Sequence, residues 1–142
     1  MGRIAIERSI WIAAPRERVW QAVTDPAQIA AWFAPGTSFS QNGNIISIRI
    51  GEDDMEVAII EVFDPPRQLT TRSLPDRALT TTYTLEEENG GTRFTVTETG
   101  FEALSEEARQ ARLDQDGQGW IMALENLKAY IEGRSLPHPE GF

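Results

Sequence analysis

Residues 79–99 read LTTTYTLEEENGGTRFTVTET, the pattern of two strands joined by a turn. Before the turn at residues 89–91, Tyr83 and its apolar neighbours share one parity and threonines occupy the other; after it, Phe94 and Val96 alternate with polar residues. A period of two directs one face of each strand to the core and the threonine-rich face to water. The stretch therefore predicts an antiparallel β-hairpin with one packed face.

The same pattern extends upstream to residue 37 and returns at the N-terminus. Turn-forming residues interrupt residues 37–99 at five places, which implies six strands. Between residues 3 and 12 four isoleucines share one parity, which adds a seventh strand. We therefore expect a seven-stranded antiparallel sheet whose apolar face packs against a C-terminal helix. The turns lie at Asn42-Gly43, Gly51 to Asp54, Asp64-Pro65-Pro66, Pro75-Asp76 and Asn89-Gly90-Gly91, and the packed face carries Ile10, Val57, Ile59, Tyr83, Phe94 and Val96.

Two short helices are expected between the first strand and the remaining six. Pro15 can open the first helix, and Asp25-Pro26 combines an N-cap residue with proline at the first helical position. Pro35-Gly36 should end the second helix. The chain is therefore predicted to be an α+β protein.

A long helix is predicted after Gly100. Ser105 can cap it, and its apolar stripe persists to about Gly133, which gives a length of about 40 Å at 1.5 Å per residue if it is continuous. Only a curved sheet could cover such a helix. Gly117 and Gly119 lie in its middle, where glycine is unfavourable, and are expected to mark a break, a kink or a close backbone approach.

Composition limits the classes of function. The 142 residues carry a net charge of −9 and no basic cluster, which argues against nucleic acid and anionic membranes as partners. The absence of cysteine excludes disulfides and thiolate chemistry, and neither a metal motif nor a cofactor motif is visible. The N-terminus does not resemble a signal peptide, so a cytoplasmic location is expected. We expect one domain over residues 1–133 and a loose tail over residues 134–142.

Short motifs spread over nearly the whole chain resemble the SRPBCC (START-related) superfamily, in the branch of the activator of the ninety-kilodalton heat-shock protein ATPase. The resemblance implies a helix-grip fold, in which a curved sheet wraps the long helix. Members of the superfamily bind lipids or small apolar molecules, cyclise polyketides or act as co-chaperone modules, so the resemblance leaves the function open. The motifs are Ala14-Pro15-Arg16-Glu17-Arg18-Val19-Trp20, Thr24-Asp25-Pro26, Trp32-Phe33, Glu61 ahead of Pro65-Pro66, Gly91-Thr92-Arg93 leading to Gly100-Phe101, and Gly119-Trp120 with Leu124 and Leu127.

Three charged residues share the parity of apolar strand faces: Arg8, Glu61 and Glu98. A charge on such a face must be paired, hydrated or functional. One interpretation is structural: the residues lie at wet strand ends, or Arg8 pairs with Glu98 because the family's sheet places the first strand beside the last. The other interpretation is that they form the polar end of a pocket and orient a ligand.

Aromatic residues supply the candidate walls of such a pocket. Trp32 and Trp120 lie near glycines at element ends and are predicted to line one cavity, although ordinary core packing is the competing interpretation. Phe33 belongs with Trp32, and Tyr83 shares the inward face with a hydroxyl that needs a partner if it is buried.

The leading hypothesis is non-catalytic binding of a small, mostly apolar molecule. The enzyme alternative is a cyclase or hydratase of polyketide type that would use Glu61, Glu98, Tyr83 and Arg8. The third class is protein interaction, either with a chaperone or in a homodimer.

Overall fold

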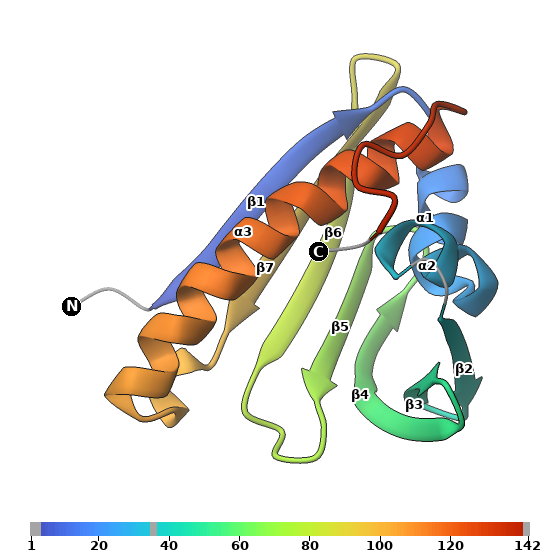
Figure 1. Ribbon diagram of the computed structural model, residues 1–142. Coiled ribbons are helices and arrows are strands. Elements are labelled where there is room, and N and C mark those ends of the chain that lie inside the picture. Colours follow the sequence, from blue (N-terminus) through green and yellow to red (C-terminus); the bar gives the residue numbers. More distant parts are fainter. Residues whose placement is uncertain (1–3, 35–36, 141–142) are drawn as a thin grey trace.

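The computed structural model describes residues 4–34 and 37–140 and shows a curved sheet that wraps one long helix (Figure 1). The α+β prediction and the predicted order of elements are confirmed. The expected stop at Pro35-Gly36 lies outside the described residues. The elements are β1 (Ala5–Ile12), α1 (Arg16–Thr24), α2 (Pro26–Phe33), β2 (Ser38–Asn42), β3 (Ile45–Ile50), β4 (Asp53–Asp64), β5 (Gln68–Ser73), β6 (Thr80–Glu88), β7 (Gly91–Thr99), the 3₁₀ turn η1 (Phe101–Ala103) and α3 (Glu106–Ile131).

The described strands form one antiparallel sheet of seven, in the order β1-β7-β6-β5-β4-β3-β2. Each strand from β2 to β7 pairs with the next strand in the chain. Strand β1 pairs with β7 and forms the edge of the sheet opposite β2. The register shifts between Ile46 and Ser47 and again between Ile60 and Val62. Such irregularities bend the bulged strand and increase its twist, and β4 is strongly curved in Figure 1.

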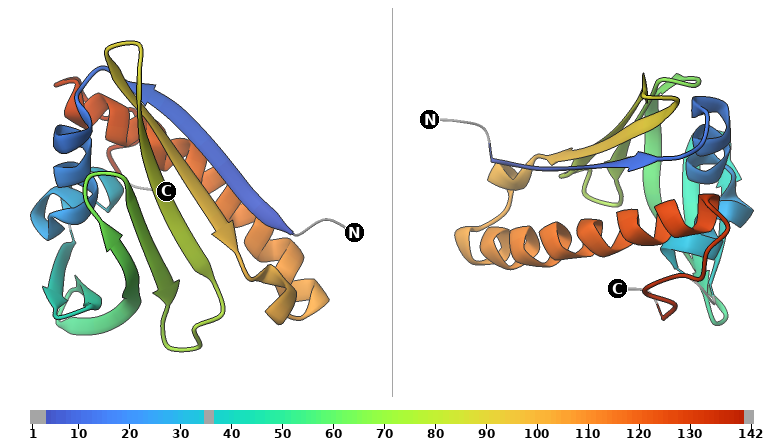
Figure 2. Two further views of the ribbon diagram at one scale, coloured as in Figure 1. Left: turned by 180° about the vertical axis from the view of Figure 1, so that it is seen from behind. Right: turned by 90° about the horizontal axis from the view of Figure 1, so that it is seen from above.

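Helix α3 runs along the concave side of the sheet beneath β1 (Figure 2). Helices α1 and α2 lie at the C-terminal end of α3, where α2 also contacts β2. Ser105 Oγ accepts a hydrogen bond from the backbone N–H of Ala108, which caps the helix as expected. The helix continues for 26 residues through Gly117 and Gly119, so the expected break is absent. The expected close approach is confirmed at Gly117, where a Cβ would lie 3.1 Å from Arg8 Nη2.

The packed face of β4 differs from the sequence prediction. Ile59 pairs in register with Arg72, and Thr71 pairs with Ile60. Cross-strand partners project to the same face, so buried Ile60 faces the core and Ile59 faces outward. Residues 57–60 are apolar at both parities, so alternation could not show which face is packed. Elsewhere the prediction is confirmed, because Phe94 and Val96 are buried and Ile10 and Tyr83 pack against the same core.

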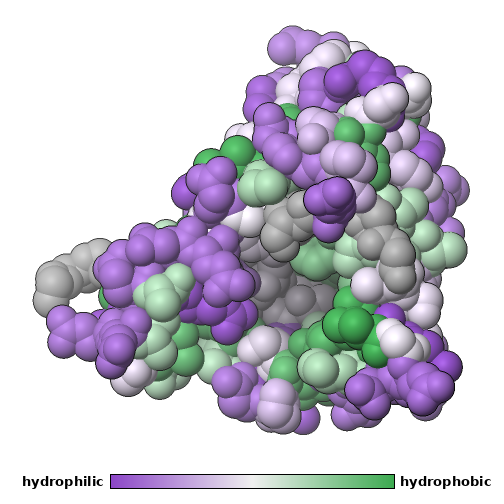
Figure 3. All heavy atoms as spheres, in the orientation of Figure 1, coloured by the Kyte–Doolittle hydropathy of each residue, from purple (hydrophilic) through white to green (hydrophobic). Residues whose placement is uncertain are grey.

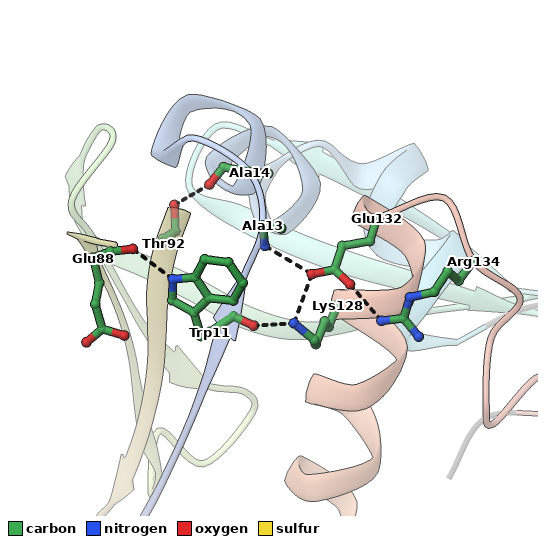
Figure 4. Close-up of polar contacts among 8 residues, drawn as sticks. All are labelled: Trp11, Ala13, Ala14, Glu88, Thr92, Lys128, Glu132 and Arg134. Atoms are coloured by element: carbon green, nitrogen blue, oxygen red, sulfur yellow. Dashed lines mark hydrogen bonds and ion pairs between the residues drawn. The ribbon is translucent and has the colours of Figure 1, made fainter. Parts of the chain in front are cut away.

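A polar cluster fastens the C-terminal end of α3 to the end of β1 (Figure 4). Lys128 Nζ donates to the carbonyl of Trp11 at 2.6 Å and pairs with Glu132 at 2.9 Å. Glu132 also accepts from the backbone N–H of Ala13 and from Arg134. Burial alone would raise the pKa of Glu132, but these hydrogen bonds and the charge of Lys128 outweigh it and lower the pKa to about 2.

The first part of the tail, residues 134–138, folds back on α3. Asn126, which is fully buried, donates from its side-chain amide to the carbonyls of Trp32 and His138 and accepts from the His138 N–H. The Arg134 N–H donates to the Ala129 carbonyl at 2.8 Å. One buried amide therefore joins α2, α3 and the tail.

Candidate functional site

Two pockets on the concave side meet at Phe33 and Trp120, which line both of them. The two rings lie 5.9 Å apart between centroids. Phe33 comes from the end of α2 and Trp120 from the middle of α3, so the site forms where these helices meet over the sheet. Figure 3 shows this face of the molecule hollowed near its centre.

The smaller pocket is apolar and has a volume of about 180 Å³. Tyr83 on β6 stands edge-on to Trp120 at 6.0 Å, which joins the sheet to the helix along one wall. Phe39 on β2 packs against Phe33 at 6.3 Å along another. The remaining lining residues are Val23, Ile29, Ile46, Val57, Ala58, Leu69, Thr71 and Thr81.

The larger pocket has a volume of about 430 Å³ and a lining that mixes charged and apolar groups. Half of this lining comes from α3, and the tail adds one residue. The lining residues besides Phe33 and Trp120 are Ala34, Thr37, Glu98, Arg112, Gln115, Asp116, Gly119 and Glu140.

Glu98 is the most unusual group in this lining, because its side chain is charged in water but only 6% exposed here. Thr81 Oγ1 donates to Glu98 Oε2 at 3.4 Å, and no donor group of the described residues reaches Oε1. Burial raises the pKa of Glu98 to about 8, and the neighbouring Asp116 carboxyl adds to the rise through a hydrogen bond and through its charge. Glu98 is therefore mostly protonated at neutral pH.

Asp116 is held in place by its own helix. Its side chain is 15% exposed, and Arg112 Nε, one turn earlier, donates to both carboxylate oxygens at 3.1 Å. Burial also raises the pKa of Tyr83, and the charge of Glu98 adds to the rise. The pocket thus holds two carboxyl groups that share one arginine beside aromatic walls.

Arg8 does not pair with Glu98 or Glu61, contrary to the sequence prediction. No ion pair joins these residues within the described part of the chain. In the register of β1 and β7, Glu98 lies opposite Ile6 and Arg8 opposite Val96, so the two charges are offset by two residues. Arg8 Nη1 donates to the Glu7 carbonyl at 3.0 Å instead.

Glu61 lies away from both pockets. It is exposed and pairs with Arg72 at 3.2 Å, on the outward face identified above from the register of β4. Its expected place among inward residues followed from the same parity that misplaced Ile59.

Trp32 is part of the core and lines neither pocket. Its side chain is 1% exposed, and its indole N–H donates to the Ala22 carbonyl at 2.8 Å. The prediction that Trp32 and Trp120 line one cavity is therefore wrong for Trp32, whereas Trp120, Phe33, Tyr83 and Glu98 do come together.

Asp116 and Arg112 were missed by the sequence argument, although a signal was present. Residues 112, 116 and 120 are spaced by four and so lie on one face of the helix. The polar residues of this face could have been placed beside Trp120. An acidic residue on a predicted helix is usually solvated, which is why this pattern alone carried no weight.

Other kinds of site were sought in the described residues. No cluster of three or more histidine, cysteine or acidic side chains is arranged there to hold a metal ion. No helix in that part of the chain has the length and apolarity needed to cross a membrane.

Comparison with known proteins identifies the family. Residues 13–132 match the family described as Activator of Hsp90 ATPase homolog 1-like protein. The chain belongs to this family. No significant match to this chain is found among curated proteins.

Solved structures with the same fold come from several organisms. A Staphylococcus saprophyticus protein is 26% identical to this chain, with a TM-score of 0.72 and coverage of 93% of this chain and 95% of the other. The Aha1 dimer of Colwellia psychrerythraea is 18% identical, with a TM-score of 0.74 and coverage of 91% and 96%. CalU16 of Micromonospora echinospora is 24% identical, with a TM-score of 0.64 and coverage of 96% and 87%. At the lower identities the likeness is one of fold.

Proposed function

We propose that the protein binds a small, mostly apolar molecule in the two adjoining pockets, without transforming it. The observation that carries the proposal is that an apolar pocket and a pocket with charged groups in its lining share Phe33 and Trp120. A single ligand could place its apolar body among the aromatic side chains and its polar end beside Glu98. Small-molecule sites commonly combine apolar walls with a few polar groups in this way.

Pocket size supports the proposal. The larger pocket, at about 430 Å³, falls within the roughly 300–1,000 Å³ that is usual for small-molecule sites. The smaller pocket is bounded by Tyr83, Leu69 and Trp120 among other apolar groups, where burial of an apolar ligand surface is favourable.

An enzyme of the cyclase or hydratase type is the second candidate, and Glu98 is the observation that favours it. A carboxylic acid with a pKa near 8 can donate a proton at neutral pH. Fewer acid–base groups are available than the sequence suggested, because Glu61 and Arg8 line neither pocket. Any such chemistry would depend on Glu98, Asp116 and Tyr83.

Native mass spectrometry of the protein purified from its own host tests the proposal directly, because a retained mass would reveal a bound molecule. A binding assay with the neutral fluorophore N-phenyl-1-naphthylamine gives a second test. Ala58→Leu narrows the small pocket and Gly119→Leu the large one, so both should weaken binding of the fluorophore. Ala111→Leu makes the same kind of change at an exposed position of α3 and should leave binding unchanged. If Ala58→Leu and Gly119→Leu bind the fluorophore as tightly as Ala111→Leu and the wild-type protein, the proposal is contradicted.

A further inference from the structure

The larger pocket contains the buried carboxyl group of Glu98, which accepts few hydrogen bonds from the described residues. We infer that this pocket recognises an organic cation, a protonated amine carried on an apolar body, with Glu98 and Asp116 as its acceptors. The inference rests on the proposed binding function and adds the chemical class of the ligand.

The first argument is the unused acceptor. Glu98 is 94% buried, and its Oε1 accepts no hydrogen bond from any described residue. Its Oε2 accepts only the long 3.4 Å bond from Thr81, and the Asp116 carboxyl can hydrogen-bond to Glu98 only while one of the two groups holds a proton. Buried polar atoms in proteins nearly always have partners, so the missing donor at this carboxyl group, which lines the pocket, favours a ligand that supplies one.

The second argument is the charge of the lining. Three carboxyl groups line the pocket, on Glu98, Asp116 and Glu140, against the single guanidinium of Arg112. Arg112 Nε is already committed to both oxygens of Asp116. Even with Glu98 mostly protonated at pH 7, the carboxyl groups of Asp116 and Glu140 outnumber the one guanidinium, so the site favours an ammonium group over an anion.

The third argument is the aromatic wall. Phe33 and Trp120 form one side of this acidic pocket, with their ring centroids 5.9 Å apart. Aromatic faces attract cations, and the combination of aromatic rings with carboxylates is a common way to bind an ammonium group that carries apolar substituents. A neutral alcohol would gain the hydrogen bond but neither of the two charge-dependent attractions.

Binding of a cation should release a proton. The groups that face the Glu98 carboxyl are Asp116 and Arg112 from α3, Thr81 and Tyr83 from β6, and Ile6 opposite it on β1, and Glu140 of the tail lines the same pocket. Burial and the Asp116 carboxyl keep Glu98 mostly protonated at pH 7. A cation beside it favours the ionised form, so affinity should rise with pH between about 6 and 8.

Isothermal titration calorimetry at pH 7 with two matched probes tests the inference. The probes are 2-(1-naphthyl)ethylamine and 2-(1-naphthyl)ethanol, which differ mainly in charge at that pH. We expect the amine to bind at least about tenfold more tightly than the alcohol. Titrations in buffers of different ionisation enthalpy should show a net release of up to one proton for the amine and none for the alcohol.

Variants separate the outcomes. Glu98→Gln should weaken amine binding at least about tenfold and abolish proton release, with little effect on the alcohol. Glu61→Gln, at an exposed carboxylate on the outer face, is the matched control and should change neither. Equal binding of amine and alcohol, or an insensitive Glu98→Gln variant, would overturn the inference and leave the proposed binding function standing. Failure of both probes to bind would overturn both proposals.

Discussion

Neutralising Glu98 should stabilise the protein at alkaline pH and have little effect at acidic pH. The change is Glu98→Gln, which keeps the shape of the side chain and removes its charge. A carboxyl group whose pKa is raised by folding resists ionisation in the folded state. The wild-type protein therefore keeps its full stability below the unfolded pKa of about 4.5 and loses stability as pH rises toward about 8, whereas the variant does not.

The size of the effect follows from the two pKa values. A rise from 4.5 to about 8, at about 1.36 kcal/mol per pH unit, sets an upper limit of about 5 kcal/mol on the difference between variant and wild type. We expect about 2–4 kcal/mol above pH 8, because the folded protein can relax around an ionised Glu98 and because the new amide must find partners beside Asp116. The difference in the free energy of unfolding between Glu98→Gln and wild type should increase from pH 5 to pH 8 and then remain constant.

Urea denaturation at intervals from pH 5 to pH 9 measures this difference. Subtracting the wild-type free energy of unfolding from that of the variant cancels the titration of groups far from the site, including Glu132. Glu61→Gln is the control, and its difference from wild type should stay flat over the same range. A Glu98→Gln difference that does not change with pH would refute the assignment of a raised pKa to Glu98.

Three further predictions concern stability. Asn126→Ala removes the amide that links Trp32 to His138, and we expect urea titrations to show a loss of about 2–4 kcal/mol; a loss below about 0.5 kcal/mol would contradict this role for Asn126. The lowered pKa of Glu132 means that its carboxylate stabilises the fold above about pH 4.5 and ceases to do so toward pH 2, so thermal melts over that range should show wild type losing its advantage over Glu132→Gln; parallel melting curves would argue against it. Arg8→Met should change the free energy of unfolding by less than about 1 kcal/mol, because no buried carboxylate loses a partner, and a loss of several kcal/mol would reveal one.

Local sequence signals determined the elements of this protein. The alternation around Phe94 and Val96, the turn residues between strands and the Ser105 cap each act over a few residues, so their structural consequence can be predicted without the rest of the chain. Seven strands, two short helices and one long helix followed from these signals. Trp120 was also recognised as a candidate wall, because it lies next to Gly119.

Only the tertiary structure decided which side chains share the site. The pairing of Ile60 with Thr71 turned Ile60 inward and Ile59 and Glu61 outward, a choice that the apolar residues at both parities of 57–60 left open. The offset between β1 and β7 placed Arg8 opposite Val96, and the path of α3 across the sheet brought Asp116 to Glu98. Register and helix placement depend on contacts between residues far apart in the chain, and periodicity within one segment does not contain them.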